Sequence, residues 1–234
     1  MAGLDSLVLD LGDDRLSVTV RRSPLAKTLS VRVDPVRGVV LVLPAKARLS
    51  DARMFLQAQR AWLAERVAKL PRSLPLLAGT MVPVQGCERL ICHNPDARRG
   101  VWMDDRAIYV SGQGEHVGRR VQDFLKVEAK RHMLATAHDL AGRIDRKPAR
   151  VTVKDTVSRW GSCSAQGHIA LSWRLILAPT WVADYVVGHE VAHLVELNHS
   201  PAFWRIVAGL GVDHHGGRAW LKAHGAGLHR YQAT

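Results

Sequence analysis

The sequence predicts an α+β protein, because strand patterns and helix patterns fall in different parts of the chain. Residues 1–114 contain short runs that alternate apolar and polar side chains, which is the period of a half-buried strand. From residue 115 onward, apolar residues recur at helical spacing instead. Gly112 and Gly114 mark the change in composition, so we expect a β-rich N-terminal region with one helix over 1–114 and a second domain over 115–234.

The amino-acid composition indicates a folded protein and argues against a membrane protein. The 234 residues are 47% hydrophobic and 23% charged, which fits a folded chain with a sizeable core and excludes a disordered one. The longest apolar run, 39–43, is far shorter than the ~20 residues that a membrane span needs. The first 14 residues carry four acids and no basic side chain, and the three cysteines form no CxxC pair. We therefore expect a soluble cytoplasmic protein that does not engage a membrane.

The first half contains one clear hairpin and one helix. The alternating segments 16–21 and 29–35 and the apolar run 39–44 predict strands, and shorter strand candidates follow at 80–84, 89–93 and 107–110. The second and third of these are expected to form a hairpin with Gly38 in the turn. A helix is expected to begin at Ser50 and Asp51 and to end near Leu70, where Pro71 stops it. Residues 71–79, rich in Pro and Leu, read as a connector.

The second half opens with a long helix, expected from about Glu115 to Arg143. Strands follow at 151–155 and 168–173. A helix is expected to start at 179–180 and to run to about 196 or 197. The next helix should start at Ser200-Pro201, with the serine as N-cap and the proline at the first helical position.

The segment 185–199 carries the chemistry, since it contains the pattern HExxH. Residues i and i+4 lie on one face of a helix, so His189 and His193 can direct ring nitrogens at one metal ion. Glu190, next to the first of them, can reach a water bound to that metal without becoming a ligand. The surrounding helix is apolar, which favours a metal site over a solvated His-rich helix.

A catalytic zinc site usually keeps three protein ligands and one open position. His199 is the favoured third ligand, but it lies six residues after His193, so the helix must end first. Asn198 tolerates the left-handed conformation at which such an end can occur. Glu196 is the competitor for this role, because 189, 193 and 196 also form one helical stripe.

Beyond this motif, the sequence resembles the YgjP-like metallopeptidases, a group often labelled SprT-family zinc proteases within the zincins. The resemblance is carried by segments 159–164, 169–179, 184–194, 198–204, 220–222 and 228–231. It implies a zincin-like metallopeptidase domain, on which the β-rich region packs and whose small sheet lies over the HExxH helix. It also implies one Zn²⁺ per chain bound by His189, His193 and His199, with Glu190 catalytic and segment 159–164 lining the cleft. Glu196 stands where the related metzincin pattern has a glycine, which weakens a metzincin label.

Metal chemistry and this resemblance together predict a zinc-dependent peptidase acting on peptide or protein substrates. Zinc would lower the pKa of a bound water, and Glu190 would take its proton and return it to the leaving amine. Further cleft candidates are Arg159, Trp160, Tyr185, His214 and His215. Tyr185 lies one turn before His189 and could stabilise an oxyanion, although packing is the favoured explanation for it. The pair His214 and His215, together with Arg218, is an alternative that could equally be surface loop.

Three further features are expected in and around the cleft. An exposed edge strand near 168–173 could pair with the main chain of a peptide substrate. Cys163 is expected to be a buried or semi-buried thiol, and Trp160, Trp173 and Trp204 to form core and cleft walls.

The net charge of +12, from 33 basic and 21 acidic residues, suggests two alternative functions. One is a DNA-associated protease that acts on proteins held on nucleic acid, with contact through a basic surface such as 119–131. The other is a noncatalytic zinc-containing module that binds nucleic acid. Solvated basic surfaces explain the same charge without a partner.

Overall fold

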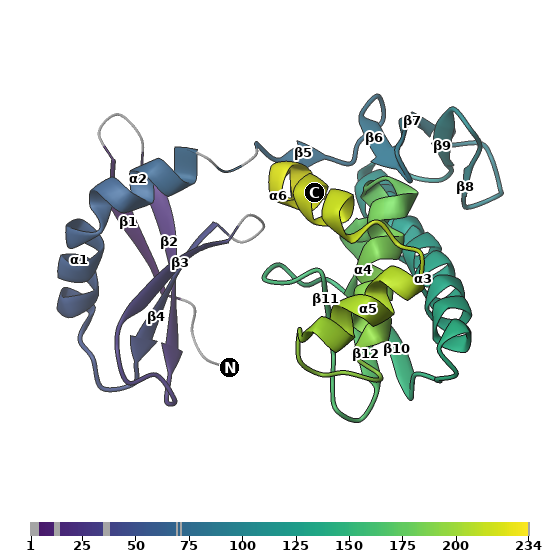
Figure 1. Ribbon diagram of the computed structural model, residues 1–234. Coiled ribbons are helices and arrows are strands. Elements are labelled where there is room, and N and C mark those ends of the chain that lie inside the picture. Colours follow the sequence, from purple (N-terminus) through teal and green to yellow (C-terminus); the bar gives the residue numbers. More distant parts are fainter. Residues whose placement is uncertain (1–4, 12–14, 35–37, 69, 71, 234) are drawn as a thin grey trace. The chain divides into compact units, whose positions relative to one another are not determined.

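The computed structural model describes residues 5–11, 15–34, 38–68, 70 and 72–233. It divides the chain into two compact units, Met1–Arg72 and Ser73–Thr234 (Figure 1). Helices and sheets occupy separate segments of the chain, which confirms the α+β class. No helix within the described residues is long and apolar enough to cross a membrane.

The first unit is a four-stranded sheet with two helices. Its strands are β1 (Asp5–Asp10), β2 (Arg15–Ser23), β3 (Ser30–Asp34) and β4 (Gly38–Pro44). They lie in the order β1-β2-β4-β3, and only the β2–β4 pair is parallel. The helices are α1 (Leu49–Ala58) and α2 (Arg60–Ala68). Alternate strand residues meet Leu56 and Leu63 of the helices in one small apolar core.

Several expectations for this unit can be compared with the structure. The β3–β4 hairpin is confirmed by the Asp34–Gly38 pairing and by the positive φ of Gly38 (+70°), while the turn at 35–37 lies outside the described residues. The single expected helix is two, because Gln59 leaves the helical conformation at φ −94° and ψ 7°. Pro71, its expected stop, also lies outside the described residues. Strand β1 was not predicted, although Leu7 and Leu9 are buried and Val8 between them is exposed.

The second unit begins with a four-stranded sheet in the order β6-β7-β9-β8. Its strands are β6 (Met81–Val84), β7 (Cys87–His93), β8 (Val101–Met103) and β9 (Ala107–Val110), of which β8 was not predicted. After a 3₁₀ turn at Gly114–His116, α3 (Val117–Arg143) crosses the unit for 27 residues. Ile91 and Ile108 of this sheet share one core with Val121 and Leu125 of α3. The division expected at Gly114 therefore falls inside a single packed unit, and the observed division is at 72/73.

The segment after α3 forms a second small sheet and three helices. The strands are β10 (Arg150–Lys154), β11 (Gly161–Cys163) and β12 (His168–Ser172), and a 3₁₀ turn, Trp173–Leu177, follows. The helices are α4 (Thr180–Ala192), α5 (Pro201–Gly209) and α6 (His214–Leu228). The strand order is β10-β12-β11, so β12 is paired on both sides. The expectation of an exposed edge strand near 168–173 is therefore wrong, because β11, which was not predicted, covers that edge.

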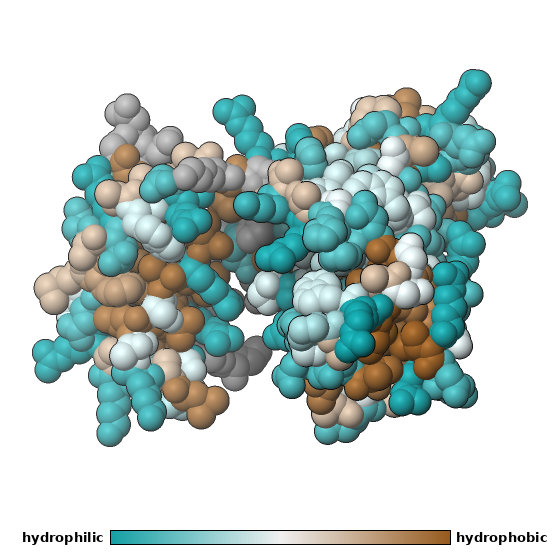
Figure 2. Space-filling view, in the orientation of Figure 1, coloured by the Kyte–Doolittle hydropathy of each residue, from teal (hydrophilic) through white to brown (hydrophobic). Residues whose placement is uncertain are grey.

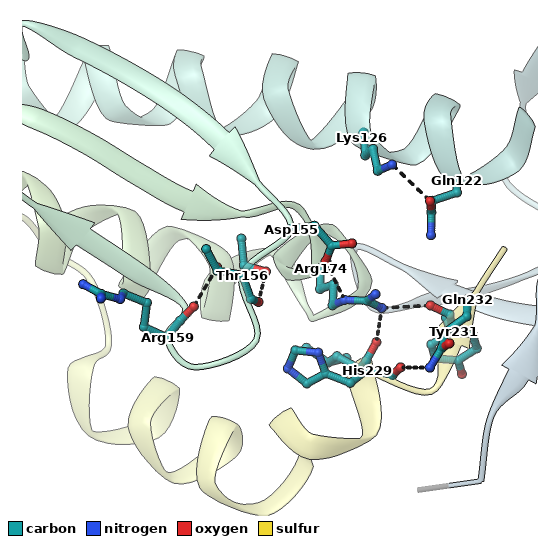
Figure 3. Close-up of polar contacts among 11 residues, drawn as sticks. Gln122, Lys126, Asp155, Thr156, Arg159, Arg174, His229, Tyr231 and Gln232 are labelled. Carbon is teal, nitrogen blue, oxygen red and sulfur yellow. Dashed lines mark hydrogen bonds and ion pairs between the residues drawn. The ribbon is translucent and has the colours of Figure 1, made fainter. Parts of the chain in front are cut away.

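The C-terminal segment is tied back into this unit. The residues of β13 (Tyr231–Gln232) pair in parallel with β5 (Leu74–Pro75). The side chain of Arg174 is 1% exposed and donates to the carbonyls of Leu228 (3.2 Å) and Tyr231 (2.8 Å), and its Nε lies 3.2 Å from Asp155 (Figure 3). In the face shown in Figure 2, the surface is mostly hydrophilic, with a hydrophobic area over α5 and the neighbouring part of α3.

Candidate metal centre

Helix α4 holds the HExxH residues inside the second unit. Its apolar residues are buried on nearly every side, including Val186, Val187 and Val191. A buried, tightly packed helix fixes the backbone of the side chains it carries, since cores are packed like crystals. His189, Glu190 and His193 therefore project from a rigid support.

Three histidines meet at the end of this helix. One ring nitrogen from each of His189, His193 and His199 lies within 4.8 Å of the other two, and Nε2 of His189 is 3.0 Å from Nε2 of His199. Zinc binds imidazole nitrogens at ~2.0–2.1 Å, which sets tetrahedral ligand atoms about 3.3 Å apart. Burial, and then the positive charges that His193 and His199 would carry, lower the pKa of His189 to about 4. Neutral imidazole is the form that binds a metal, so both spacing and charge fit a divalent ion.

The chain reaches His199 by a shorter helix than expected. Helix α4 ends at Ala192, about four residues before the expected end, and the backbone continues in tight turns. The N–H groups of Leu194 and Val195 donate to carbonyls three residues earlier, which closes the helix. Among the described non-glycine residues, only Gln85 and Asp145 have positive φ, so a left-handed Asn198 is not what turns the chain.

Glu196 supports the cluster from outside it. Its carbonyl lies 2.9 Å from Nδ1 of His193 and its carboxylate accepts from the N–H of Asn198 at 3.3 Å. A hydrogen bond at Nδ1 fixes which nitrogen of His193 faces a metal. The geometry thus brings His199, and not Glu196, into the cluster. Ser200 caps α5 as expected, accepting from the N–H of Phe203 at 3.3 Å.

Glu190 lies beneath strand β11. It is 6% exposed, and burial raises the pKa of its carboxyl to about 7, against the opposing effect of Arg159. A Cβ at Gly161 would lie 2.5 Å from its Oε1, so the strand passes directly over the carboxylate. The strand therefore restricts the positions that the Glu190 carboxylate can take.

The remaining cleft candidates are distributed around this centre. The Tyr185 ring is 6.1 Å from that of His189 and is 8% exposed, and burial raises the pKa of its hydroxyl. Arg159 is exposed, and Trp160 stacks on His229 at 5.2 Å and packs against the core of the unit.

The His214–His215 pair does not lie in a surface loop. Both residues form the first turn of α6, and His214 is 5.3 Å from the ring of Trp204. Trp204 in turn lies 5.9 Å from the rings of both His189 and His199. The pair therefore adjoins the cluster through this tryptophan and does not belong to it.

Two residues at the site were missed in the sequence. The ring of Phe203 lies 4.5–4.9 Å from all three histidine rings, and Gly161 allows β11 to approach Glu190. Phe203 could have been found from its place one turn into the helix that follows His199. Gly161 lies in the segment 159–164 that the resemblance places along the cleft, but its particular role carries no local signal, because it depends on a contact 29 residues away in sequence.

A histidine cluster of this geometry beside a buried glutamate on the same helix is typical of a metallopeptidase. The chain belongs to the YgjP-like metallopeptidase domain family, which it matches over residues 27–224. Membership implies a peptidase hydrolase that uses a metal, usually zinc.

The chain also has a distant likeness to a solved structure. The crystal structure of the metallopeptidase zymogen of Pyrococcus abyssi abylysin is 21% identical, covers 45% of this chain and 99% of its own, and has a TM-score of 0.35. No curated protein matches the sequence.

Proposed function

We propose that the protein is a zinc-dependent peptidase in which His189, His193 and His199 hold the metal and Glu190 moves the proton. The observation that supports this most directly is the convergence of three imidazole nitrogens within 4.8 Å of one another. Glu190 lies next to His189 on helix α4. When bound, zinc would supply Lewis acidity, polarising the scissile carbonyl and acidifying water.

The residues of the chain would do the rest. Glu190 would accept a proton from the attacking water and donate it to the leaving amine, and its burial suits a group that must both take up and release a proton. The carbonyl of Glu196 would hold His193 in the orientation that binds metal. Phe203 and Trp204 would keep the imidazoles in place by packing against their rings.

The test compares Glu190→Gln with Glu115→Gln, which removes the same negative charge from an exposed glutamate in the turn before α3. Cleavage of a quenched fluorescent peptide library and zinc per chain would be measured for both. We expect Glu190→Gln to keep zinc near one per chain and to lose at least a hundredfold in kcat/KM, with the control unchanged. Full activity in Glu190→Gln would reject the proposed proton transfer. A zinc-loaded wild type without peptidase activity would favour the noncatalytic module.

Contact with DNA is a second proposal, and the structure gives it weaker support. Of the basic residues over 119–131, Lys126 lies 3.6 Å from Asp123, Arg131 pairs with Glu128, and Arg120 donates to the carbonyl of Ser111. Charges satisfied within the fold contribute less to binding phosphate. Binding of single-stranded DNA that weakens steeply between 50 and 200 mM salt, as expected for about six phosphate contacts, would support this proposal, and no binding would exclude it.

A further inference from the structure

A cavity of about 570 Å³ opens beside the histidine cluster, and we infer that it receives a carboxylate of the bound peptide, from an acidic side chain or from its C-terminus. The lining is Trp204 of α5 and His214, His215, Arg218, Ala219 and Lys222 of α6. The inference rests on the proposed peptidase function, because it assigns a substrate preference to the same site.

The cavity shares a wall with the metal centre. Trp204 lines it and also lies 5.9 Å, ring to ring, from His189 and His199. An extended peptide advances about 3.3 Å per residue. If its scissile carbonyl lies at the cluster, a group one or two residues away reaches this cavity.

The charge of the lining is positive. His215, Arg218, Ala219 and Lys222 follow the spacing i, i+3, i+4, i+7, which places them on one face of α6. Arg218 and Lys222 are exposed, and neither forms an ion pair within the part of the chain that the structure describes. The helix itself carries no acidic residue. The acidic residue that directly precedes the helix in sequence, Asp213, caps it by accepting from Gly216 at 2.9 Å and lines a different cavity.

This arrangement is unfavourable without an anion. Arg218 and Lys222 are like charges four residues apart on α6, and such a pair is repulsive. A carboxylate placed between them would relieve this repulsion. Trp204 adds a flat wall against which the aliphatic part of a glutamate side chain can pack. Among the anionic groups of an unmodified peptide, only carboxylates fit this description.

The experiment measures binding with zinc-loaded Glu190→Gln protein, which leaves the peptide intact. Labelled peptides that differ only by glutamate or glutamine at each position flanking the scissile bond would be titrated by fluorescence anisotropy at 50 mM salt. Each glutamine peptide would also be made with a free and with an amidated C-terminus. We expect at least tenfold tighter binding of a carboxylate-bearing peptide over its neutral counterpart, decreasing as salt rises.

The assignment to this cavity is tested by adding Arg218→Gln and Lys222→Gln together. This pair should reduce the ratio of affinities to below about threefold, since it removes the charges that produce the tenfold difference. Lys147→Gln with Arg150→Gln removes the same charge at two exposed positions outside the cavity and should keep the ratio. The peptide that binds most tightly shows whether the cavity receives a glutamate side chain or the C-terminal carboxylate.

Equal affinities for charged and neutral peptides, or binding of neither, would overturn the inference. So would a preference that survives loss of Arg218 and Lys222. Cleavage by the wild type, measured separately, decides the proposed function. A peptidase that cleaves glutamate and glutamine peptides equally would keep its function and lose this preference.

Discussion

Replacing Gly161 by alanine tests the contact between β11 and Glu190. The added Cβ would lie 2.5 Å from Oε1, 2.6 Å from Cγ and 2.8 Å from Cδ of Glu190. Ordinary contact begins near 3.4 Å, so the carboxylate or the strand must move by about 0.9 Å. The φ of Gly161 is not in the left-handed region, so the collision alone determines the effect.

A displacement of about 1 Å in a catalytic group lowers activity by about a hundredfold. Overpacking costs about 1–3 kcal/mol of stability. The three imidazoles are untouched, so Gly161→Ala should keep its zinc. The assay is kcat/KM on a quenched peptide, with zinc per chain and the thermal midpoint measured on the same preparation.

The matched control is Gly142→Ala in α3, where an added Cβ meets nothing within 4 Å. It should leave activity unchanged and stabilise the helix by about 0.5–1 kcal/mol. Gly161→Ala with activity within twofold of the wild type would refute the placement of β11 over Glu190.

Three further perturbations follow from the same geometry. His199→Ala should weaken zinc binding at least a hundredfold, because losing a group that only supports a ligand already costs tenfold or more. Glu196→Ala should retain zinc, because only the backbone carbonyl of Glu196 touches His193. Competition with a chelator measures the zinc affinity of both variants, and equal affinities would contradict the cluster. Burial, and then the charge of Glu190, raise the pKa of the Cys163 thiol to about 11, so its thiolate should form only as pH rises toward that value. Mass spectrometry after iodoacetamide at pH 9 should find the exposed Cys87 alkylated first, and early labelling of Cys163 would count against this burial. Arg174→Met removes the donor to two buried carbonyls and should lower the free energy of unfolding by about 3 kcal/mol, or the thermal midpoint by roughly 6–12 °C. The control is Arg150→Met, at an exposed arginine. Equal thermal midpoints for the two variants would show that the hydrogen bonds of Arg174 contribute little.

The strong periodic elements could be read from the sequence. Helix α3 was predicted nearly to the residue, because its apolar repeat extends over seven turns and buries Val121, Leu125 and Ala129 along one side. The His189, Glu190 and His193 constellation was also accessible, since one helical turn suffices to bring its ligands together.

Helix α6 could not be predicted in the same way. It contains four glycines, which disfavour a helix by about 1 kcal/mol each relative to alanine. Packing explains two of them, because a Cβ at Gly217 would collide with the ring of Tyr185 and one at Gly225 would lie 3.0 Å from Trp160. Gly216 lies against the Asp213 side chain that caps the helix, and a Cβ at Gly227 would meet nothing within 4 Å. Close approach to a side chain from another helix or loop is a tertiary property that the local sequence does not show.

The end of α4 illustrates a further limit. The apolar pattern continues past Ala192 through Leu194 and Val195, so periodicity alone predicts a longer helix. The bond between His193 Nδ1 and the Glu196 carbonyl favours a turn instead. A hydrogen bond between a histidine ring and a carbonyl three residues later can therefore end a helix that propensity would extend.

The pairing of β13 with β5 has a consequence for how the second unit could be rearranged. Tyr231 and Gln232 lie opposite Leu74 and Pro75, so this unit starts and finishes on the same two-stranded ribbon. A short glycine-rich linker could join those two ends, and a new opening could be made at the exposed turn after α3, around Asp145–Lys147. In such a circular permutant, residues 1–72 would no longer be joined directly to Ser73, and the histidine cluster of the second unit would still be formed by one polypeptide.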